Sequence, residues 1–338
     1  MSLLLLTLLL PAAYGQSAKG TPAPRYQIIE LPLRPLSISN SGWVAGTTDD
    51  QHAATWNSKS GLGRIPLPPE FSFSECSGIN SSGEAAGTAS TADSSRRVAF
   101  AFRQSKVVLL PGEQSRASGI SEDGEIVGQT ILAGSKSAGP VLWKNSVPID
   151  LKICCAGSAR SMNAQGLIIG DTYDKEGRYH AFLWDAVRGA RVITVPGEEY
   201  SSALALDSRG ETLLRATPGG LLLYSDGKLH PIDIPKGTPH AMNKDGIVVG
   251  SFGPNPDAQR AFIWGKAHGL QDLNTLIPAT SGWKLEVASS INDRGEIVGW
   301  GDHNGVENAG FLLRPRGNGN KSRPHAVRTG QDDHRAQN

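Results

Sequence analysis

The chain has 338 residues, of which 38% are hydrophobic and 19% are charged, and its formal net charge is +1. This composition is typical of a globular protein and excludes a disordered chain. The near-zero charge provides no general attraction to nucleic acid or to an anionic membrane, so neither is expected as a partner.

The first predicted element is a signal peptide. An apolar run from Leu3 to Ala13 is too short to span a bilayer. Ala13 and Gly15 are the small residues that signal peptidase requires just before its cleavage point, although no Lys or Arg precedes the run. We therefore expect a signal peptide over 1–15, a linker over 16–25 and a mature protein that is extracellular or periplasmic. No later apolar stretch is long enough for a membrane span.

Seven copies of one motif follow, of which "INDRGEIVG" at 291–299 is typical. Each copy has an apolar residue, then Asn, Asp or Ser, then a glycine three residues later, and the copies recur about every forty residues. Asn, Asp or Ser caps such a turn and the glycine accepts a positive φ, so each copy is predicted to be a tight hairpin. The turn glycines are Gly42, Gly83, Gly124, Gly166, Gly210, Gly246 and Gly295.

Two further strands are predicted in each copy: a third that ends in a large apolar residue, and a fourth that is less regular. The seventh copy lacks the fourth strand, whereas residues 26–31 form a strand that belongs to no hairpin. This pattern predicts an all-β fold, a seven-bladed β-propeller with four-stranded antiparallel blades over 26–314. We expect the N-terminal strand to close the ring, and the polar, aperiodic residues 315–338 to be a disordered tail.

The fifth copy, at 203–215, departs most from the pattern. The other six copies have a second glycine four residues after the turn glycine, and the fifth has Leu214 at that position. We therefore expect the fifth blade to be irregular.

The repeated columns resemble those of a known family. The hairpin motif followed by strands such as "HAFLW" at 180–184 and "RAFIW" at 260–264 resembles the HAF-repeat family of predicted bacterial extracellular proteins, over roughly residues 30–314. The resemblance implies secretion and a propeller-like fold. It implies no activity, because the family is recognised by its structural columns.

No motif for catalysis or metal binding stands out. The sequence has no H-E-x-x-H, C-x-x-C or G-x-S-x-G pattern and no phosphate loop, and its acidic turns lack the spaced ligands of a calcium loop. We therefore expect no metal, no cofactor and no catalytic residues. Any pairing of the three cysteines, Cys76, Cys154 and Cys155, leaves one thiol over, and free thiols are the favoured interpretation.

The loops that lead into the first strand of each copy are the predicted binding site. In a propeller they gather on one face, around the mouth of the central channel. Their mixed charges and aromatic rings suit a small polar ligand or a sugar. We expect Arg160, His240 and Trp283 to supply charge, hydrogen bonding and stacking. The further candidates are Glu75, Arg116, Glu198 and Tyr200.

Three functions are compatible with these features. The first is a secreted, monomeric binding module for an extracellular ligand, either a carbohydrate or a protein. The second is an extracellular carbohydrate-active hydrolase or lyase with its site at the channel mouth, in which Glu75, Glu198 and Arg160 would have to face one another. The third is a purely structural surface protein. We favour the binding module, because the sequence contains no evident acid–base constellation.

Overall fold

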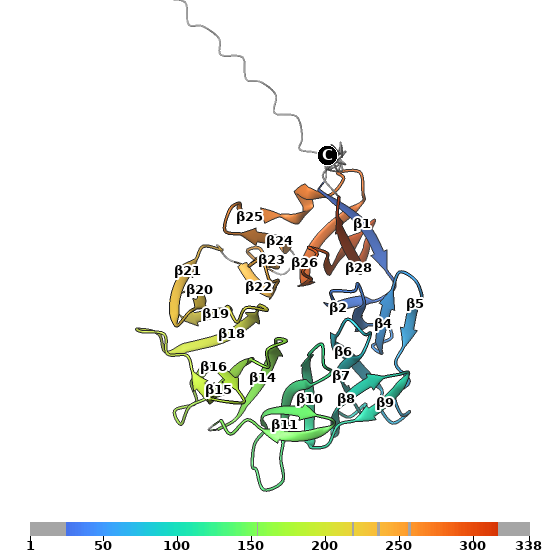
Figure 1. The fold of residues 1–338 in the computed structure, drawn as a ribbon. Coiled ribbons are helices and arrows are strands. Elements are labelled where there is room, and N and C mark those ends of the chain that lie inside the picture. The colour runs from blue at the N-terminus through green and yellow to red at the C-terminus, as the bar shows by residue number, and fades with distance from the viewer. Residues whose placement is uncertain (1–24, 154, 218–219, 235–236, 256–257, 317–338) are drawn as a thin grey trace, which may run out of the picture.

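The computed structural model describes residues 25–153, 155–217, 220–234, 237–255 and 258–316. The predicted signal peptide, most of the linker, nearly all of the polar tail and Cys154 lie outside the described residues. Within the described part, the strands form seven four-stranded antiparallel sheets arranged radially in a ring (Figure 1). The predicted seven-bladed β-propeller is therefore confirmed.

The first three blades each consist of four consecutive strands, with the first strand nearest the centre of the ring (Figure 1). Blade 1 contains β2 (Arg34–Ile38), β3 (Val44–Thr47), β4 (Ala53–Asn57) and β5 (Gly61–Arg64). Blade 2 contains β6 (Phe73–Ile79), β7 (Ala85–Ser90), β8 (Arg97–Arg103) and β9 (Lys106–Leu109). Blade 3 contains β10 (Glu113–Ile120), β11 (Ile126–Ile131), β12 (Gly139–Lys144) and β13 (Val147–Asp150).

The next three blades have the same order. Blade 4 contains β14 (Gly157–Met162), β15 (Ile168–Tyr173), β16 (Tyr179–Asp185) and β17 (Gly189–Val192). Blade 5 contains β18 (Tyr200–Leu206), β19 (Thr212–Thr217), β20 (Gly220–Ser225) and β21 (Lys228–Ile232). Blade 6 contains β22 (Gly237–Met242), β23 (Val248–Phe252), β24 (Arg260–Gly265) and β25 (Gly269–Asp272), and the 3-10 helix η2 (Leu273–Leu276) follows it.

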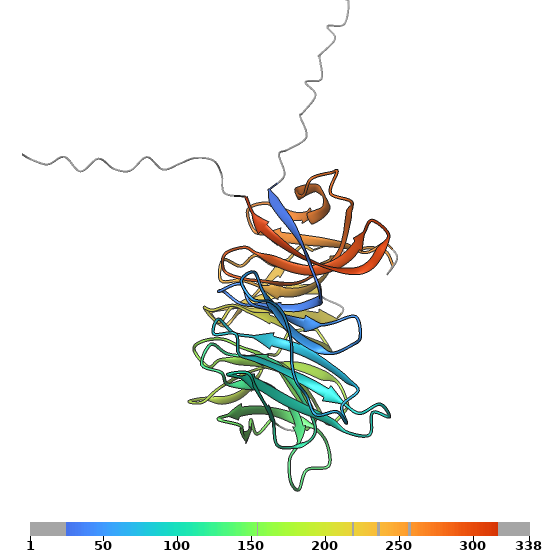
Figure 2. The same ribbon diagram turned by 90° about the vertical axis from the view of Figure 1, so that its right-hand side faces the viewer.

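Blade 7 is built from both ends of the described chain. Its inner strands are β26 (Trp283–Ile291), β27 (Ile297–His303) and β28 (Val306–Pro315), and its outer strand is β1 (Tyr26–Leu31). The β1–β28 ladder is antiparallel and runs from the pair Tyr26–Pro315 to the pair Leu31–Gly310. Both views show β1 beside the strands of blade 7 (Figure 1, Figure 2). The predicted closure of the ring by the N-terminal strand is confirmed.

In four of the blades, the second glycine of the motif leaves room for an aromatic ring. Gly87 lies opposite Phe100 in the β7–β8 ladder, and a Cβ on Gly87 would lie 2.6 Å from that ring and 2.1 Å from the carbonyl oxygen of Glu75. Glycine and phenylalanine are paired in the same way in blades 4, 6 and 7. In blade 5, Leu214 lies opposite Leu222 instead. The fifth blade is nevertheless a complete four-stranded sheet. The expected irregularity is therefore limited to the replacement of the glycine–phenylalanine pair by two leucines.

The hydrophobic core lies between the blades. One cluster, for example, joins Ala45 and Ala53 of blade 1 to Val98 and Phe100 of blade 2. Burying apolar side chains against the next blade is the main stabilising term for such a ring, since a single four-stranded sheet has no core of its own. The repeated columns therefore specify contacts between neighbouring blades as much as the blades themselves.

Candidate functional site

The propeller has two faces with different loops. The turn face carries the seven hairpin turns, whose glycines all have φ between +69° and +91° as the motif predicts. The loop face carries the connections that lead into each first strand and those that join the second and third strands. Because every blade has the same strand order, equivalent residues from all seven copies meet on the same face.

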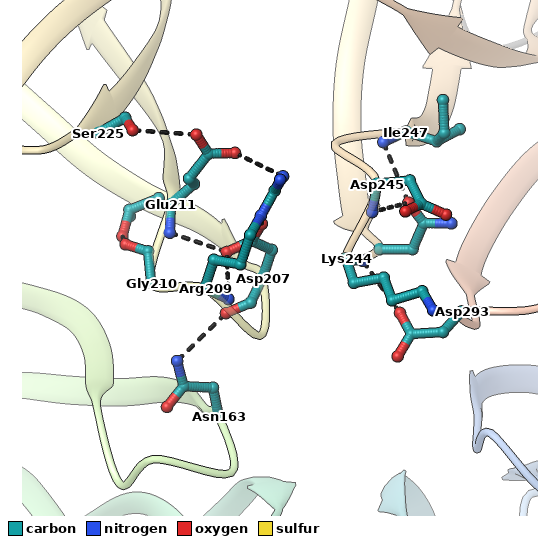
Figure 3. A network of polar contacts seen from close by, with 12 residues as sticks. Asn163, Asp207, Arg209, Gly210, Glu211, Ser225, Lys244, Asp245, Ile247 and Asp293 are labelled. Atoms are coloured by element: carbon teal, nitrogen blue, oxygen red, sulfur yellow. Dashed lines mark hydrogen bonds and ion pairs between the residues drawn. The ribbon is translucent and has the colours of Figure 1, made fainter.

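On the turn face, the Asn of the motif makes two kinds of hydrogen bond. In blade 4, Oδ1 of Asn163 accepts from the backbone N–H groups of Gln165 and Leu167, both at 3.1 Å. Its Nδ2 donates to the carbonyl oxygen of Asp207, the equivalent residue of blade 5, at 3.2 Å (Figure 3). The same link joins Asn80 to Ser121, Asn243 to Asn292, and Asn292 to Ser39 across the ring closure.

Where the motif has Ser or Asp, the described residues contain no such amide link. Ser121 caps its own turn through Oγ, and Asp207 pairs with Arg209 of its own turn at 3.1 Å. Figure 3 shows this pair on one side and Lys244, which donates its N–H to Asp293, on the other. The side chains of the motif are thus engaged in holding turns and blades together.

On the loop face, a cavity of about 740 Å³ opens between blades 1, 2, 3 and 7. Its wall combines residues from first, second and third strands with the connection between β3 and β4. The lining is mostly polar, and Phe73, which is 40% exposed, contributes an aromatic ring. The charged residues of this loop-face pocket are Arg34, Asp49, Glu75, Arg97, Arg116 and Glu307.

Three of these side chains come from one column of the repeat. Arg34, Glu75 and Arg116 each stand eight residues before the turn glycine, in blades 1, 2 and 3. Nη2 of Arg116 donates to Oε1 of Glu75 at 2.9 Å. Arg34 instead lies over the indole of Trp300 in blade 7, with 4.0 Å from Cζ to the ring centroid. Desolvation lowers the pKa of the Arg34 guanidinium, and the charge of Glu75 opposes that shift.

Several polar groups of the pocket have no partner within the described part of the chain. The side chains of Arg34, Asp49, Arg97 and Glu307 form no hydrogen bond or ion pair there. The hydroxyl of Thr88, which lies opposite Glu75 in the β6–β7 ladder, is buried and also lacks a hydrogen-bond partner. These groups remain available to a ligand.

The predicted residue Arg160 lies outside this pocket and has a structural partner. Its Nη2 donates to Oδ2 of Asp171 at 2.9 Å. Asp171 also accepts from the hydroxyl of Ser202 and from the N–H of Ala203 in blade 5, at 3.0 and 2.8 Å. Arg160 therefore belongs to a junction between blades 4 and 5.

The two predicted aromatic residues also pack against neighbours. Trp283 is half-buried, stacks on His303 with 4.4 Å between ring centroids, and meets Phe311 edge-on. Tyr200 of blade 5 contacts Tyr179 of blade 4, with 5.1 Å between centroids. These contacts place both rings at packing positions away from the loop-face pocket.

His240 and Glu198 are likewise not among the residues that line the pocket. His240 lies on β22, with Nε2 3.3 Å from the hydroxyl of Ser251. Desolvation lowers the pKa of His240, and the charge of Arg215 lowers it further, so the neutral imidazole is favoured. Glu198 lies in the connection that precedes β18.

The structure brings together two of the seven predicted residues, Glu75 and Arg116. Six of the seven lie on first strands rather than in the loops where the sequence analysis placed them. Arg34, Arg97 and Glu307 were missed. For Arg34 a signal existed, because it occupies the same repeat column as Glu75 and Arg116.

A second cavity, of about 590 Å³, lies on the turn face between blades 6 and 7. Its polar lining is partly engaged: Asn243 donates to the carbonyl of Asn292, and Asp293 bonds with Asn40. Asp245 is the one charged residue of its lining whose side chain forms no hydrogen bond or ion pair within the described part of the chain, against four such residues in the loop-face pocket. The loop-face pocket, with its unpartnered charges, is therefore the stronger candidate for a binding site.

Metal binding finds no support in the described residues, and neither does chemistry at the thiol of Cys76. They contain no group of three or more His, Cys, Asp or Glu side chains placed to hold a metal ion. Cys76 is a buried free thiol, and burial together with the charge of Glu75 raises its pKa, which makes it unreactive. In the same part of the chain, no helix has the length and apolar character needed to cross a membrane.

Comparison with known proteins supports the fold. No family model matches the sequence, and no curated protein matches it. The β-propeller domain of the Trilobed protease from Pyrococcus furiosus is similar with a TM-score of 0.57 at 11% identity, over 84% of this chain and 95% of that one. That propeller is described as having an open velcro topology, whereas here β1 pairs with β28.

Two further solved structures have the same architecture. Virginiamycin B lyase from Staphylococcus aureus has a TM-score of 0.57 at 13% identity, over 86% of this chain and 99% of that one. YCF48 bound to D1 peptide has a TM-score of 0.52 at 12% identity, over 86% and 96%. At such low identity the similarity establishes the propeller fold and nothing about activity.

Proposed function

We propose that the protein is a secreted binding module that captures a small polar ligand in the loop-face pocket. The observation that carries the proposal is the pocket itself, whose Arg34, Asp49, Arg97 and Glu307 side chains form no hydrogen bond or ion pair within the described residues. Its volume of about 740 Å³ lies within the range of about 300–1,000 Å³ that is usual for ligand sites. Unpaired polar groups around a recess supply the directional contacts that orient a ligand.

A carbohydrate suits this lining better than a protein partner. Sugar hydroxyls can donate to Asp49 or Glu307 and accept from Arg97, while the apolar face of a sugar ring can stack on Phe73. A stable protein interface usually covers about 800 Å² on each partner. Here the unpartnered groups gather in a single recess instead.

The alternative of a carbohydrate-active hydrolase or lyase receives less support. It required Glu75, Glu198 and Arg160 to face one another, and these residues belong to blade 2, to the connection before blade 5 and to blade 4. Glu75 is paired with Arg116, and Arg160 is paired with Asp171. Of the three, only Glu75 lines the pocket.

A carbohydrate array probed with the mature protein tests the proposal, with turnover measured on every hit. Binding should be lost in Phe73→Ala and in Glu75→Gln, both in the pocket. It should persist in Tyr179→Ala and in Arg160→Gln, matched aromatic and charged positions outside the pocket. The opposite pattern would contradict the proposed site, and turnover of a bound sugar would favour the enzyme instead.

Secretion is tested separately. N-terminal sequencing of exported protein should give a mature chain that begins at or near Gln16, because Ala13 and Gly15 mark the cleavage point. Recovery of intact chain starting at Met1 from the cytoplasm alone would contradict secretion.

A further inference from the structure

The loop-face pocket combines one cation that stacks on an aromatic ring with carboxylates that face solvent. Arg34 lies against Trp300, whereas Arg116 is neutralised by Glu75. The other carboxylates, Asp49 and Glu307, are exposed and therefore well solvated. The guanidinium of Arg34 is exposed like these carboxylates, but its contact with Trp300 holds it in place, and it forms no hydrogen bond or ion pair with the described residues.

A guanidinium in this setting favours an anionic ligand. Stacking on an indole fixes the plane of the guanidinium and leaves its N–H edge free, which suits bidentate binding of a carboxylate. Within the described residues no carboxylate forms an ion pair with this guanidinium, so a bound anion would meet no direct competitor.

The polar groups beside Arg34 favour a ligand that has hydroxyl groups as well as a carboxylate. Glu75 is an acceptor that can take a second hydrogen bond in addition to that from Arg116. The buried hydroxyl of Thr88 lies opposite Glu75 and has no partner within the described chain. A simple carboxylate would leave these groups unsatisfied, whereas a polyhydroxylated one would engage them.

On the basis of the function proposed above, we infer that the ligand is a carboxylated sugar, a uronic acid unit. Its carboxylate binds Arg34, and its ring hydroxyls bind Glu75 and Thr88. The same chemistry is found in a free uronic acid and in the terminal unit of an acidic polysaccharide. The volume of the pocket accommodates either.

Calorimetric titration or ligand-observed NMR tests this inference with matched sugars. D-galacturonate and D-galactose differ in the carboxylate alone, and a short oligogalacturonide tests whether a polymer end is preferred. Galacturonate should bind at least about tenfold more tightly than galactose, and added salt should weaken its binding. Acetate should bind far more weakly than galacturonate, because it lacks the hydroxyls.

Variants of Arg34 provide the second arm. Arg34→Gln should lower the affinity for galacturonate about tenfold or more and leave the affinity for galactose unchanged. Arg34→Lys should bind galacturonate with an affinity between those of wild type and Arg34→Gln, because lysine keeps the positive charge but cannot donate two parallel hydrogen bonds. Arg160→Gln is the matched control and should behave as wild type. Thermal unfolding of each variant checks that it folds.

The outcomes separate this inference from the proposed function. Equal affinity for galactose and galacturonate, or full binding by Arg34→Gln, would overturn the carboxylate assignment. Loss of that binding in Phe73→Ala would still support the pocket. Absence of binding to every sugar, neutral or acidic, would overturn both.

Discussion

The turn face and the loop face are built from the two ends of the same seven hairpins, and they differ in how strictly one column of the repeat is constrained. On the turn face, the motif residue is always Asn, Asp or Ser, and it caps its own turn. At the opposite end, eight residues before the turn glycine, the column reads Arg34, Glu75, Arg116, Ser158, Ser202, Thr238 and Val287.

The contrast has a physical cause. A tight turn leaves backbone N–H groups that a neighbouring side-chain oxygen must satisfy, so few residue types are acceptable there. Where a first strand begins, the ladder already satisfies the backbone, and the side chain can vary with little cost. The turn column is therefore constrained by the turn itself, whereas the column at the start of the first strands can differ from blade to blade, as the candidate site on the loop face requires.

The largest effect is expected from removing the turn-face amide at the ring closure. Asn292→Ala should lower the free energy of unfolding by about 3 kcal/mol, because it removes the turn cap, leaves the buried N–H of Glu296 without its acceptor and breaks the amide links to Ser39 and to the Glu296 carboxylate. Urea denaturation measures the change. Ser90→Ala on the loop face is the comparison and should change it by less than about 0.5 kcal/mol. Equal losses of stability in the two variants would mean that the two faces do not differ in their contribution to stability.

The next effect depends on pH. Burial alone would raise the pKa of the Glu296 carboxyl, but the hydrogen bond from Asn292 and the guanidiniums of Arg294 and Arg314 outweigh burial and hold the pKa below 4.5. A lowered folded pKa means that this stabilisation is present above about pH 4.5 and is lost as the pH falls through the folded value. Glu296→Gln should therefore cost about 2 kcal/mol at pH 7 and less in acid.

Denaturation curves at several pH values distinguish this account from a simple packing effect. The stability difference between wild type and Glu296→Gln should shrink below pH 4.5. Glu307→Gln, an exposed carboxylate of the loop face, is the matched control and should show no comparable trend. A difference for Glu296→Gln that is independent of pH would mean that its charge does not contribute.

Single substitutions can remove an amide hydrogen bond between two blades or add one. Asn163→Ser keeps a turn cap and removes the link to Asp207, so it should cost about 1 kcal/mol. Ser121→Asn adds an amide at a junction that lacks one and should gain a similar or smaller amount. Thermal unfolding of both variants and of the double variant tests this, and loss of stability on adding the amide would show that the junctions are not equivalent.

The fold could be predicted from the sequence because its rules are local and repeated. The turn glycines require positive φ, and the orphan strand at 26–31 matched the strand missing from the last copy. Leu214 was taken as a sign of an irregular blade, but it lies opposite Leu222, and the two leucines take the places of the glycine and the phenylalanine paired in other blades. Paired substitutions of this kind are visible only once the strand register is known.

The candidate site could be predicted only in part, because it depends on contacts between blades. Glu75 and Arg116, two of the predicted residues, line the candidate pocket on the expected face, since all first strands begin on the same side. Arg160 was expected to bind ligand, yet Asp171, on the second strand of its own blade, takes up its charge. Arg34 was missed because the search was confined to loops, and its contact with Trp300 joins residues at opposite ends of the chain.

The smallest effect on stability is expected in the loop-face pocket. A small effect there would show that the charged side chains of the pocket do not stabilise the fold. Arg97→Gln, Asp49→Asn and Glu307→Gln each remove an exposed charge that has no partner within the described residues. Each should change the free energy of unfolding by less than about 0.5 kcal/mol, since no native contact is lost. A cost above about 1 kcal/mol would reveal a structural role and weaken the case for a ligand. Neutral stability combined with lost binding would mean that the fold tolerates these charges and that recognition requires them.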